Sequence, residues 1–513
     1  MGFSCLQHLP FAMAMVLMLC FFLLNLVWLC WLSPMKMKRR LEKKGFKGPP
    51  PKFPFGNINE MRKRAPLAPN SLINHDIHAR AFPYFAQWRK SYGDTFVYWL
   101  GTEPFLYVAD PEFVKLMNSS MGGKGWGKPS VFKHDRKAMF GKGLLMVEGE
   151  EWAHHRQTVA PFFSSGNLKA MIDIMVDSTN KMLDAWSKLV DSGTTEIDVE
   201  SEITRSAAEI IARASFGVSY ENGKDIFKML RAIQQILFKS QRPVGVPYNG
   251  ILHLRNLRKA VQLFLLSKQV DSSFLKLVND RRSNTDIQRT DLLGLLLRDG
   301  TSEKERRFTS QELVDECKTF FFAGHETTSL ALSWTLMLLA SHVEWQKELR
   351  EEVMEATKGE TLDSNMLPKL KKMGWVMKEV MRLYPSGPNV QRQAREDIQI
   401  GDKMVPKGTN IWVDIVALHH DPRLWGEDVN EFKPQRFREG VQEACKHRTG
   451  YIPFGFGSRM CVGQNLFMME YKVVLAMILS RFSLSISPYY CHSPTIMLSL
   501  RPSHGVPLIL HPL

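Results

Sequence analysis

The chain has 513 residues, 44% of them hydrophobic, and its 67 lysines and arginines outnumber its 52 acidic residues, for a net charge of +15. That length can bury a large core, and the charge indicates an anionic membrane, an acidic protein or nucleic acid as a partner. The sequence has neither an arginine-rich recognition helix nor zinc-knuckle spacing, so nucleic acid is the weakest of the three. Its seven cysteines form no C-x-x-C pair, which predicts a reduced, cytosol-facing protein without a disulfide framework.

An apolar segment near the N-terminus predicts a membrane anchor. Leu9–Leu32 is 24 residues without a charge, and such a helix is roughly 36 Å long, enough for a hydrocarbon core of about 30 Å. The alternative is a cleaved signal peptide, which would carry its positive charges before the apolar core. Here the lysines and arginines come after it, between Lys36 and Lys47, and so keep that end in the cytosol. We predict an uncleaved anchor over residues 1–33, most simply on the endoplasmic reticulum, with the remainder cytosolic.

A basic and proline-rich hinge is predicted over residues 34–56. Four prolines fall within the six residues Pro49–Pro54, and they stiffen the backbone. The stretch is therefore either a connector that fixes the attitude of the globular part to the membrane or an ordinary linker. Beyond it the sequence shows no internal repeat and no second boundary, so residues 57–513 are predicted to form one domain.

The sequence predicts strands in the first part of this domain and helices in most of the remainder. Thr95–Leu100 and Phe105–Val108 have the composition of a hairpin. Residues 121–143 are rich in glycine and lysine and predict a loop, without the G-x-G-x-x-G spacing of a phosphate site. From Gly149 to about residue 340 helical patterns dominate, interrupted at 243–248 and by a charged stretch, 281–307, predicted to be solvated.

Trp152 and Arg156 lie four residues apart and therefore on one face of a predicted helix. Taken alone, the pair is as consistent with an aromatic ring packed on an arginine stem as with a binding site.

A long helix with an unusual centre is predicted from Thr309 to about His342. Thr309 and Glu312 form a capping box at its start. Its middle, Ala323–Thr328, contains a glycine and two threonines, which are poor helix formers, so this turn can open locally and admit water or a ligand. The His-Glu pair within it does not make a zinc-protease motif, because position 329 is serine.

Glu379 and Arg382 lie three apart at the end of another predicted helix, which stops at Pro385. An ordinary surface ion pair is the alternative interpretation, with a contribution of only a few tenths of a kcal/mol.

The segment Phe454–Gly463 holds Cys461 in a glycine-dense loop, with Arg459 two residues before it and an apolar, helix-like run after it. Positive charge and a helix N-terminus lower the pKa of a cysteine, so we expect a metal-ligating thiolate. A lone cysteine is more often a small buried hydrophobe.

The whole pattern F-x-x-G-x-R-x-C-x-G resembles the haem-binding loop of the cytochromes P450, and the anchor, W-x-x-x-R, the A-G-x-E-T-T turn and E-x-x-R occur in that family's order. The resemblance implies the mainly α P450 fold, a helical bundle around haem plus a small β-rich lobe. It implies haem b as the cofactor and Cys461 as its axial thiolate, which favours O–O cleavage.

The same resemblance implies roles for the remaining motif residues. Those expected to bind haem, through its propionates or as part of the loop, are Trp152, Arg156, Arg392, Arg459 and Phe454. Thr327 and Glu326 are expected to be catalytic and to deliver protons during oxygen activation. Glu379, Arg382 and Arg436 are expected to buttress the haem loop, although Gln435 stands where the family often has glutamate.

The implied activity is a monooxygenase that inserts one oxygen atom of O2 into a C–H bond of a small hydrophobic or isoprenoid-bearing molecule. No dinucleotide-binding fingerprint is present, so electrons are expected from NADPH through a separate reductase. Lipid and a small hydrophobic substrate are the other expected partners. An isomerase or dehydratase without oxygen activation and a haem sensor are alternatives, but the first typically lacks the threonine that Thr327 provides.

Several segments resemble a plant P450 clan that includes the cytokinin hydroxylases, notably Asp315–Thr328, His75–Ile77 and Cys461–Asn465. Cytokinin side-chain hydroxylation is therefore the first candidate, with fatty-acid or gibberellin hydroxylation as the alternative. The segments expected to line the substrate pocket are 121–143, 241–252, the turn at Ala323, 386–390 and 495–497.

Overall fold

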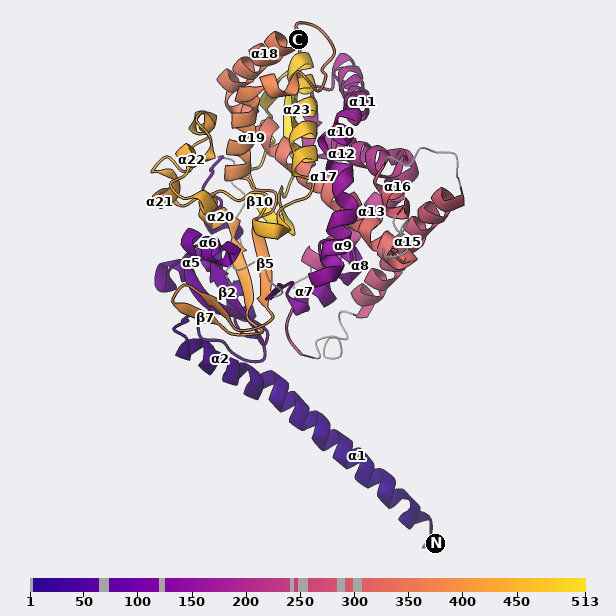
Figure 1. The fold of residues 1–513 in the computed structure, drawn as a ribbon, viewed down its shortest axis with the longest axis vertical. Coiled ribbons are helices and arrows are strands. Elements are labelled where there is room, and N and C mark those ends of the chain that lie inside the picture. The colour runs from indigo at the N-terminus through magenta and orange to yellow at the C-terminus, as the bar shows by residue number, and fades with distance from the viewer. Residues whose placement is uncertain are drawn as a thin grey trace.

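The computed structural model describes residues 3–63, 73–119, 125–239, 244–247, 257–283, 291–298 and 307–513. Predicted pocket residues 121–124 and most of 241–252 lie outside the described residues. The N-terminal helical run is α1 (Phe3–Val27), a π-helical turn (Trp28–Leu32) and α2 (Ser33–Lys43). It extends away from the body of the protein as one rod (Figure 1). Its part Met13–Lys43 is long and apolar enough to cross a membrane, with a mean hydropathy of 2.5.

The strand-rich lobe contains a five-stranded sheet of order β1-β2-β8-β5-β3, with β2 and β8 parallel. Its strands are β1 (Thr95–Leu100), β2 (Glu103–Val108), β3 (Trp126–Gly127), β5 (Asn389–Ala394) and β8 (Asn410–Asp414), beside a hairpin of β6 (Ile398–Ile400) and β7 (Lys403–Val405). The predicted hairpin is confirmed as the antiparallel pair β1 and β2. Short helices surround the sheet: α3 (Ile58–Lys63), α4 (His78–Ala81), α5 (Pro83–Tyr92), α6 (Pro111–Ser119), α20 (Ile415–His419), α21 (Pro422–Trp425) and α22 (Val441–Ala444).

The predicted hinge packs against this lobe. Leu41 and Phe46 are buried in its core. The Lys47 carbonyl accepts a hydrogen bond from Val97 N at 2.9 Å, and Asn57 Oδ1 accepts one from Trp99 N at 2.9 Å. Residues 41–57 thus cover the outer strand β1 of the sheet.

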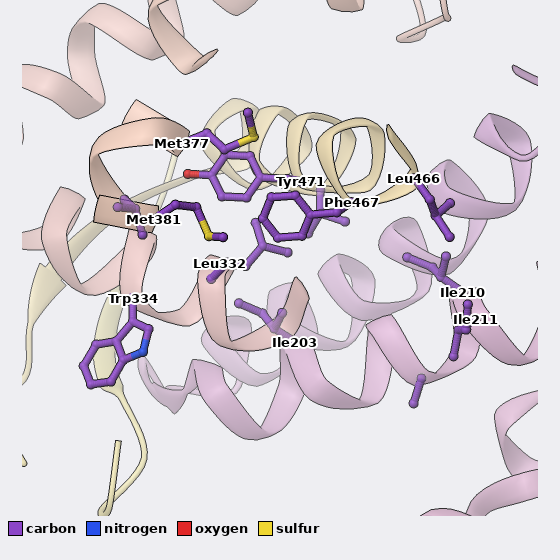
Figure 2. Close-up of a cluster of buried hydrophobic side chains, with 14 of the residues drawn as sticks. Ile203, Ile210, Ile211, Leu332, Trp334, Met377, Met381, Leu466, Phe467 and Tyr471 are labelled. Atoms are coloured by element: carbon purple, nitrogen blue, oxygen red, sulfur yellow. The ribbon is translucent and has the colours of Figure 1, made fainter. Parts of the chain in front are cut away.

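The helical body consists, within the described part of the chain, of eleven helices around one core. They are α9 (Gly149–Val159), α10 (Ser165–Ala170), α11 (Ile172–Asp191), α12 (Val199–Phe216), α13 (Tyr220–Lys239), α15 (Leu257–Ser283), α16 (Leu292–Arg298), α17 (Ser310–Ser341), α18 (Val343–Thr357), α19 (Lys371–Leu383) and α23 (Gln464–Arg481). Side chains from α12, α17, α19 and α23 come together at the centre, as Figure 2 shows for Ile203, Leu332, Met377 and Tyr471. The mainly α architecture predicted from the sequence is confirmed.

The helix α17 begins as predicted, because Thr309 Oγ1 accepts from Glu312 N at 3.2 Å and the Glu312 carboxylate accepts from Thr309 N at 2.8 Å. Beside it lie a three-stranded sheet, β4 (Glu196–Asp198), β12 (Pro507–Pro512) and β9 (Phe482–Ile486), and a hairpin, β10 (Pro494–Met497) and β11 (Ser499–Pro502).

The predictions of two loops are partly wrong. Within 121–143 the chain forms β3, α7 (Ser130–Asp135) and α8 (Lys137–Phe140), because Phe132 and Phe140 bury their rings in the core and hold these turns in place. Within 281–307 it forms α16, whose buried Leu292 and Leu296 were obscured in the sequence by the charges around them.

Candidate functional site

One turn of α17 is accessible although the helix around it is buried. From Glu312 to Ala340 every residue is buried except Ala323, which is exposed, and Gly324 and Thr327, which are partly exposed. Ala323, Gly324 and Thr327 all belong to the turn that the sequence predicts to open locally. Thr327 Oγ1 donates to the Ala323 carbonyl at 2.9 Å, so the hydroxyl is held within this accessible turn.

The loop around Cys461 folds back on itself so that its thiol is presented outward. Cys461 N donates to the Phe454 carbonyl at 3.0 Å, and the ring of Phe454 packs edge-on against Phe467 of α23. Gly455 and Gly457 have φ of +76° and +69°, a region open to glycine but strained for other residues. Cys461 is exposed by its accessible surface, so its thiol can reach a ligand, although many protein atoms surround it.

The prediction that the protein alone lowers the pKa of Cys461 is wrong. Burial among surrounding protein atoms is the largest effect and raises the pKa of the thiol, while the backbone N–H of Gly463 and the charge of Arg156 act against it without prevailing. The helix α23 begins only at Gln464, three residues beyond the sulfur. A bound metal cation would favour the thiolate where the protein alone does not.

Basic side chains gather beside the loop. The guanidinium of Arg459 lies 4.4 Å above the ring of Trp152 on α9, and Arg156 is close enough to Cys461 for each to shift the other's pKa. Arg392 is 5% exposed, and its Nε has no hydrogen-bond partner among the described residues. Burial and then the neighbouring Arg459 lower the pKa of Arg392 to about 10. The two arginines thus repel each other, and an anionic ligand would reduce this repulsion.

Lys128 belongs to the same group and was not predicted. Burial, followed by the charges of Arg392, Arg459 and Arg136, holds the pKa of Lys128 well below its usual range. The only local signal in the sequence was a lysine before a proline, which does not distinguish a binding residue from a loop residue. An anion at this position would relieve the repulsion.

The three residues predicted to buttress the loop form a buried ion-pair network. Arg382 donates from Nε and Nη2 to the two carboxylate oxygens of Glu379 at 2.7 and 2.8 Å, and both residues are fully buried. Arg436 Nε lies 3.5 Å from Glu379 Oε1, and its Nη2 donates to the Asp428 carbonyl at 2.6 Å. The surface ion pair considered as the alternative is therefore excluded.

A histidine connects this network to the cysteine loop. Arg382 Nη1 donates to the His419 carbonyl at 3.1 Å, and His419 Nε2 accepts from Ile452 N at 3.1 Å, two residues before Phe454. Burial, then the charges of His420 and Arg382, lowers the pKa of His419 to about 3, so the ring is neutral and can accept this bond. The network thus connects to the start of the loop through the hydrogen bond from Ile452 N to the His419 ring.

Glu326 does not face Thr327. Its Oε1 accepts instead from Ser499 Oγ on β11 at 2.6 Å and from Gln234 Nε2 on α13 at 2.9 Å. The other predicted pocket segments are partly accessible, at Gly387, Asn389, Val390, Thr495 and Ile496. Ser386 is buried instead, and its Oγ donates to the Thr327 carbonyl at 2.9 Å.

A separate pocket of about 340 Å³ opens behind the loop. It is lined by residues of α19, α22, the loop and α23, including Lys378, Arg448, Tyr451, Met460 and Met468. Neither Cys461 nor Thr327 lines it. It is therefore not the space in which a substrate would meet both groups.

Comparison with known proteins identifies the family that shares this arrangement. The family model described as cytochrome P450 matches residues 65–505. The chain belongs to the cytochrome P450 family. Cytochrome P450 714C2 of Oryza sativa subsp. japonica is 37% identical over 512 residues, 97% of each chain. Cytochrome P450 714A2 of Arabidopsis thaliana is 38% identical over 491 residues, 92% of each chain, and a cytokinin hydroxylase of Arabidopsis thaliana is 36% identical over 498 residues, 94% of each.

The residues of this P450 fit the haem that its family uses. The exposed thiol of Cys461 can serve as the iron ligand, and the accessible turn of α17 can border the open face of the haem. The arginine cluster, in which the buried Nε of Arg392 has no hydrogen-bond partner among the described residues, can bind the two propionates. The protein is accordingly a P450 monooxygenase by family, and its N-terminal helix fits a membrane anchor.

Proposed function

We propose that this P450 hydroxylates a small hydrophobic plant hormone, with the isoprenoid side chain of a cytokinin as the first candidate substrate. Two relatives of similar identity are named cytokinin hydroxylase, at 36% and 37%. The observation that carries the oxygen-inserting chemistry is the accessible turn of α17, where Thr327 provides a hydroxyl.

Haem b, held by Cys461 and by propionate contacts to Trp152, Arg156, Arg392, Arg459 and Lys128, would supply oxygen activation. The protein chain contributes by positioning the reacting groups. Thr327 holds a hydroxyl proton at Oγ1 on the accessible turn, and the apolar surroundings exclude bulk water and orient the substrate's C–H bond. Phe454 and the buttress keep the thiol in place.

Electrons are proposed to come from NADPH through a membrane-bound reductase. The pocket behind the loop brings Lys378 and Arg448 next to Met460 and Phe454, so a basic, partly apolar surface lies directly behind the ligating cysteine. An acidic flavoprotein surface would complement it. The anchor would place both proteins on the same membrane, which we propose to be the endoplasmic reticulum.

A second candidate, hydroxylation of a fatty acid or a gibberellin, is favoured by Arg136. Its guanidinium carbon lies 4.3 Å from the ring centroid of Phe132 and 5.9 Å from that of Phe238 on α13. Its Nε has no hydrogen-bond partner among the described residues, and burial lowers its pKa to about 10. A carboxylate on an otherwise hydrophobic substrate would pair with it.

Reconstitution with a plant NADPH–P450 reductase tests these proposals. Isopentenyladenine, dodecanoic acid and a gibberellin would each be supplied, and hydroxylated products measured with NADPH consumption. Product from isopentenyladenine alone supports the first candidate, and product from the acids alone supports the second. Cys461→Ala is the control: it should lose the thiolate-type spectrum of the carbon-monoxide complex and all turnover, and an unchanged spectrum would remove Cys461 as the ligand.

A further inference from the structure

Two helices bring a histidine and two carboxylates together away from the groups used above. Glu151 and His155 lie four residues apart on α9, and Glu312 lies in the first turn of α17. Residues four apart share one face of a helix, so the first two point in the same direction. A ring nitrogen of His155 and one carboxylate oxygen from each glutamate all lie within 4.8 Å of one another. None of the three belongs to the predicted haem contacts, the accessible turn or the ion-pair network.

The His155 ring has one nitrogen in use and one without a partner. The residue is 0% exposed, and its Nδ1 lies 2.5 Å from Glu316 Oε1. An ionised carboxylate only accepts hydrogen bonds, so Nδ1 is the donor and Nε2 of the neutral ring carries a lone pair. Nε2 is buried and has no hydrogen-bond partner in the part of the chain that the structure describes. A buried polar atom of this kind is destabilising unless another group binds it.

The contact with Glu316 is the one that a metal-binding histidine usually makes. A carboxylate that accepts from one ring N–H fixes the orientation of the ring and makes the other nitrogen a better ligand. Glu316 is itself 0% exposed on α17. The ring of Phe308 packs against that of His155 with the centroids 4.7 Å apart. The histidine is therefore held from two sides before any ion binds.

Both glutamates can take part in such a site. Glu312 Oε2 accepts from Thr309 N at 2.8 Å, and a carboxylate has acceptor sites on both oxygens, so the helix cap and a cation can share it. Glu151 is partly exposed, which gives an ion a route from solvent.

The donor set selects the cation. One imidazole nitrogen and two carboxylate oxygens suit Zn²⁺, which commonly takes three protein ligands and a water. Ca²⁺ and Mg²⁺ prefer oxygen ligands alone and more of them. Bonds of about 2.0–2.2 Å place neighbouring ligands of a tetrahedral zinc ion about 3.4 Å apart. Small rotations of the two glutamate side chains close the present spacing of up to 4.8 Å to that value.

We propose that Glu151, His155 and Glu312 bind one zinc ion. Glu316 is then a positioning residue, which holds the histidine ring through Nδ1. The ion would join α9, which also carries Trp152, to the start of α17 and so brace these two helices against each other. The site lies outside the proposed reaction and does not depend on the identity of its substrate.

Zinc binding by the full-length, haem-loaded protein tests this proposal without NADPH or substrate. After dialysis against EDTA and then against buffered zinc chloride, bound zinc would be counted by mass spectrometry, and its Kd measured by competition with a fluorescent chelator. The ligand variants are Glu151→Gln, His155→Gln and Glu312→Gln. The last of these keeps the cap of α17, because glutamine serves in a capping box as well as glutamate does.

The matched control is Glu150→Gln, which makes the same change of charge at the neighbouring, exposed position. Retention of the thiolate-type carbon-monoxide spectrum shows that each variant is folded. Glu151→Gln decides the question even if the buried His155→Gln does not fold, because Glu151 is partly exposed.

Wild type and Glu150→Gln should bind one zinc ion more than the ligand variants do, and their melting temperatures should rise with zinc concentration. Glu316→Gln should weaken binding by about 10–100-fold, the usual effect of losing the partner of a metal-binding histidine, and each ligand variant at least as much. Equal zinc content and Kd in wild type and Glu151→Gln would overturn the proposal. So would equal weakening in Glu150→Gln and Glu151→Gln, which would show a general effect of charge. Displacement of the zinc by millimolar calcium or magnesium would overturn the assignment of a nitrogen ligand.

Discussion

Thr327 and its neighbour Thr328 differ in the surroundings of their hydroxyls. Both donate to the carbonyl four residues earlier, at 2.9 Å to Ala323 and 3.3 Å to Gly324. Thr327 is partly exposed on the accessible turn, whereas Thr328 is 2% exposed on the packed side of α17. The pair therefore provides a matched test of a proton-handling role.

Thr327→Ala should keep haem and the carbon-monoxide spectrum while lowering the product formed per NADPH consumed. The stability cost should be similar to that of Thr328→Ala, about 1 kcal/mol for one intrahelical hydrogen bond. Product yield and NADPH oxidation measured together in both variants would check this. Full coupling in Thr327→Ala, or equal uncoupling in Thr328→Ala, would exclude the specific role.

His419 predicts how the cysteine loop responds to acid. Its pKa is about 3 in the folded protein and near 6.5 when exposed, so the unfolded chain takes up the proton first. Stability from this residue is complete above the unfolded pKa and is lost as the pH falls from 6.5 towards 3. Between pH 7 and pH 5 the loss is about 2 kcal/mol for this one site.

Urea unfolding of wild type and His419→Gln at pH 7, 6 and 5 should therefore show a shallower pH dependence in the variant. Burial also lowers the pKa of His75, His420 and His492, so the wild-type slope has several contributions and the difference between the two proteins is the informative quantity. His504→Gln, at an exposed position, serves as the control. Parallel slopes in wild type and His419→Gln would contradict the buried neutral state.

At the scale of elements, the packing of α12 on α17 requires a glycine at the accessible turn. A Cβ at Gly324 would lie 2.5 Å from Ile211 Cγ1 and 2.6 Å from Ile211 Cδ1. Gly324→Ala should therefore destabilise the protein by about 1–3 kcal/mol through overpacking, less roughly 1 kcal/mol regained in helix propensity. The same change made on an Ile211→Ala background should cost much less, because only the Ile211 Cβ contact at 3.3 Å remains. Unfolding free energies of the four proteins would show this coupling, and additive effects would refute it.

Prediction from sequence succeeded where the determining contacts are local. The start of α17 follows from Thr309 and Glu312, three residues apart, and the hairpin from two strand-like runs separated by a two-residue turn. The hydrogen bonds of Glu326 were not foreseen, because Gln234 and Ser499 are 92 and 173 residues away from it in sequence. Lys128 was missed for the same reason. The lowered pKa expected for Cys461 failed because sequence spacing reveals nearby charge but not the desolvation that opposes it.

At the scale of the whole molecule, the anchor and the body meet in a segment that belongs to the body. Leu41 and Phe46 are 1% and 3% exposed within the core of the strand lobe, and residues 47 and 57 hydrogen-bond to β1. Burial of a leucine and a phenylalanine contributes about 3–6 kcal/mol together, a large part of a typical folding free energy of about 5–15 kcal/mol. The boundary predicted at residue 57 would cut through these contacts.

Two truncations test where the body begins. Removal of residues 1–32 should release the protein from membranes and preserve both the carbon-monoxide spectrum and the thermal stability, since the described side chains of α1 are largely exposed. Removal of residues 1–56 should lower the melting temperature markedly and promote haem loss, because it uncovers β1. Phe46→Ala in the shorter truncation should fall between the two, at a cost of about 3–5 kcal/mol. Equal stability of the two truncated proteins would show that residues 33–56 are a dispensable linker and that their packing on the sheet contributes nothing to the fold.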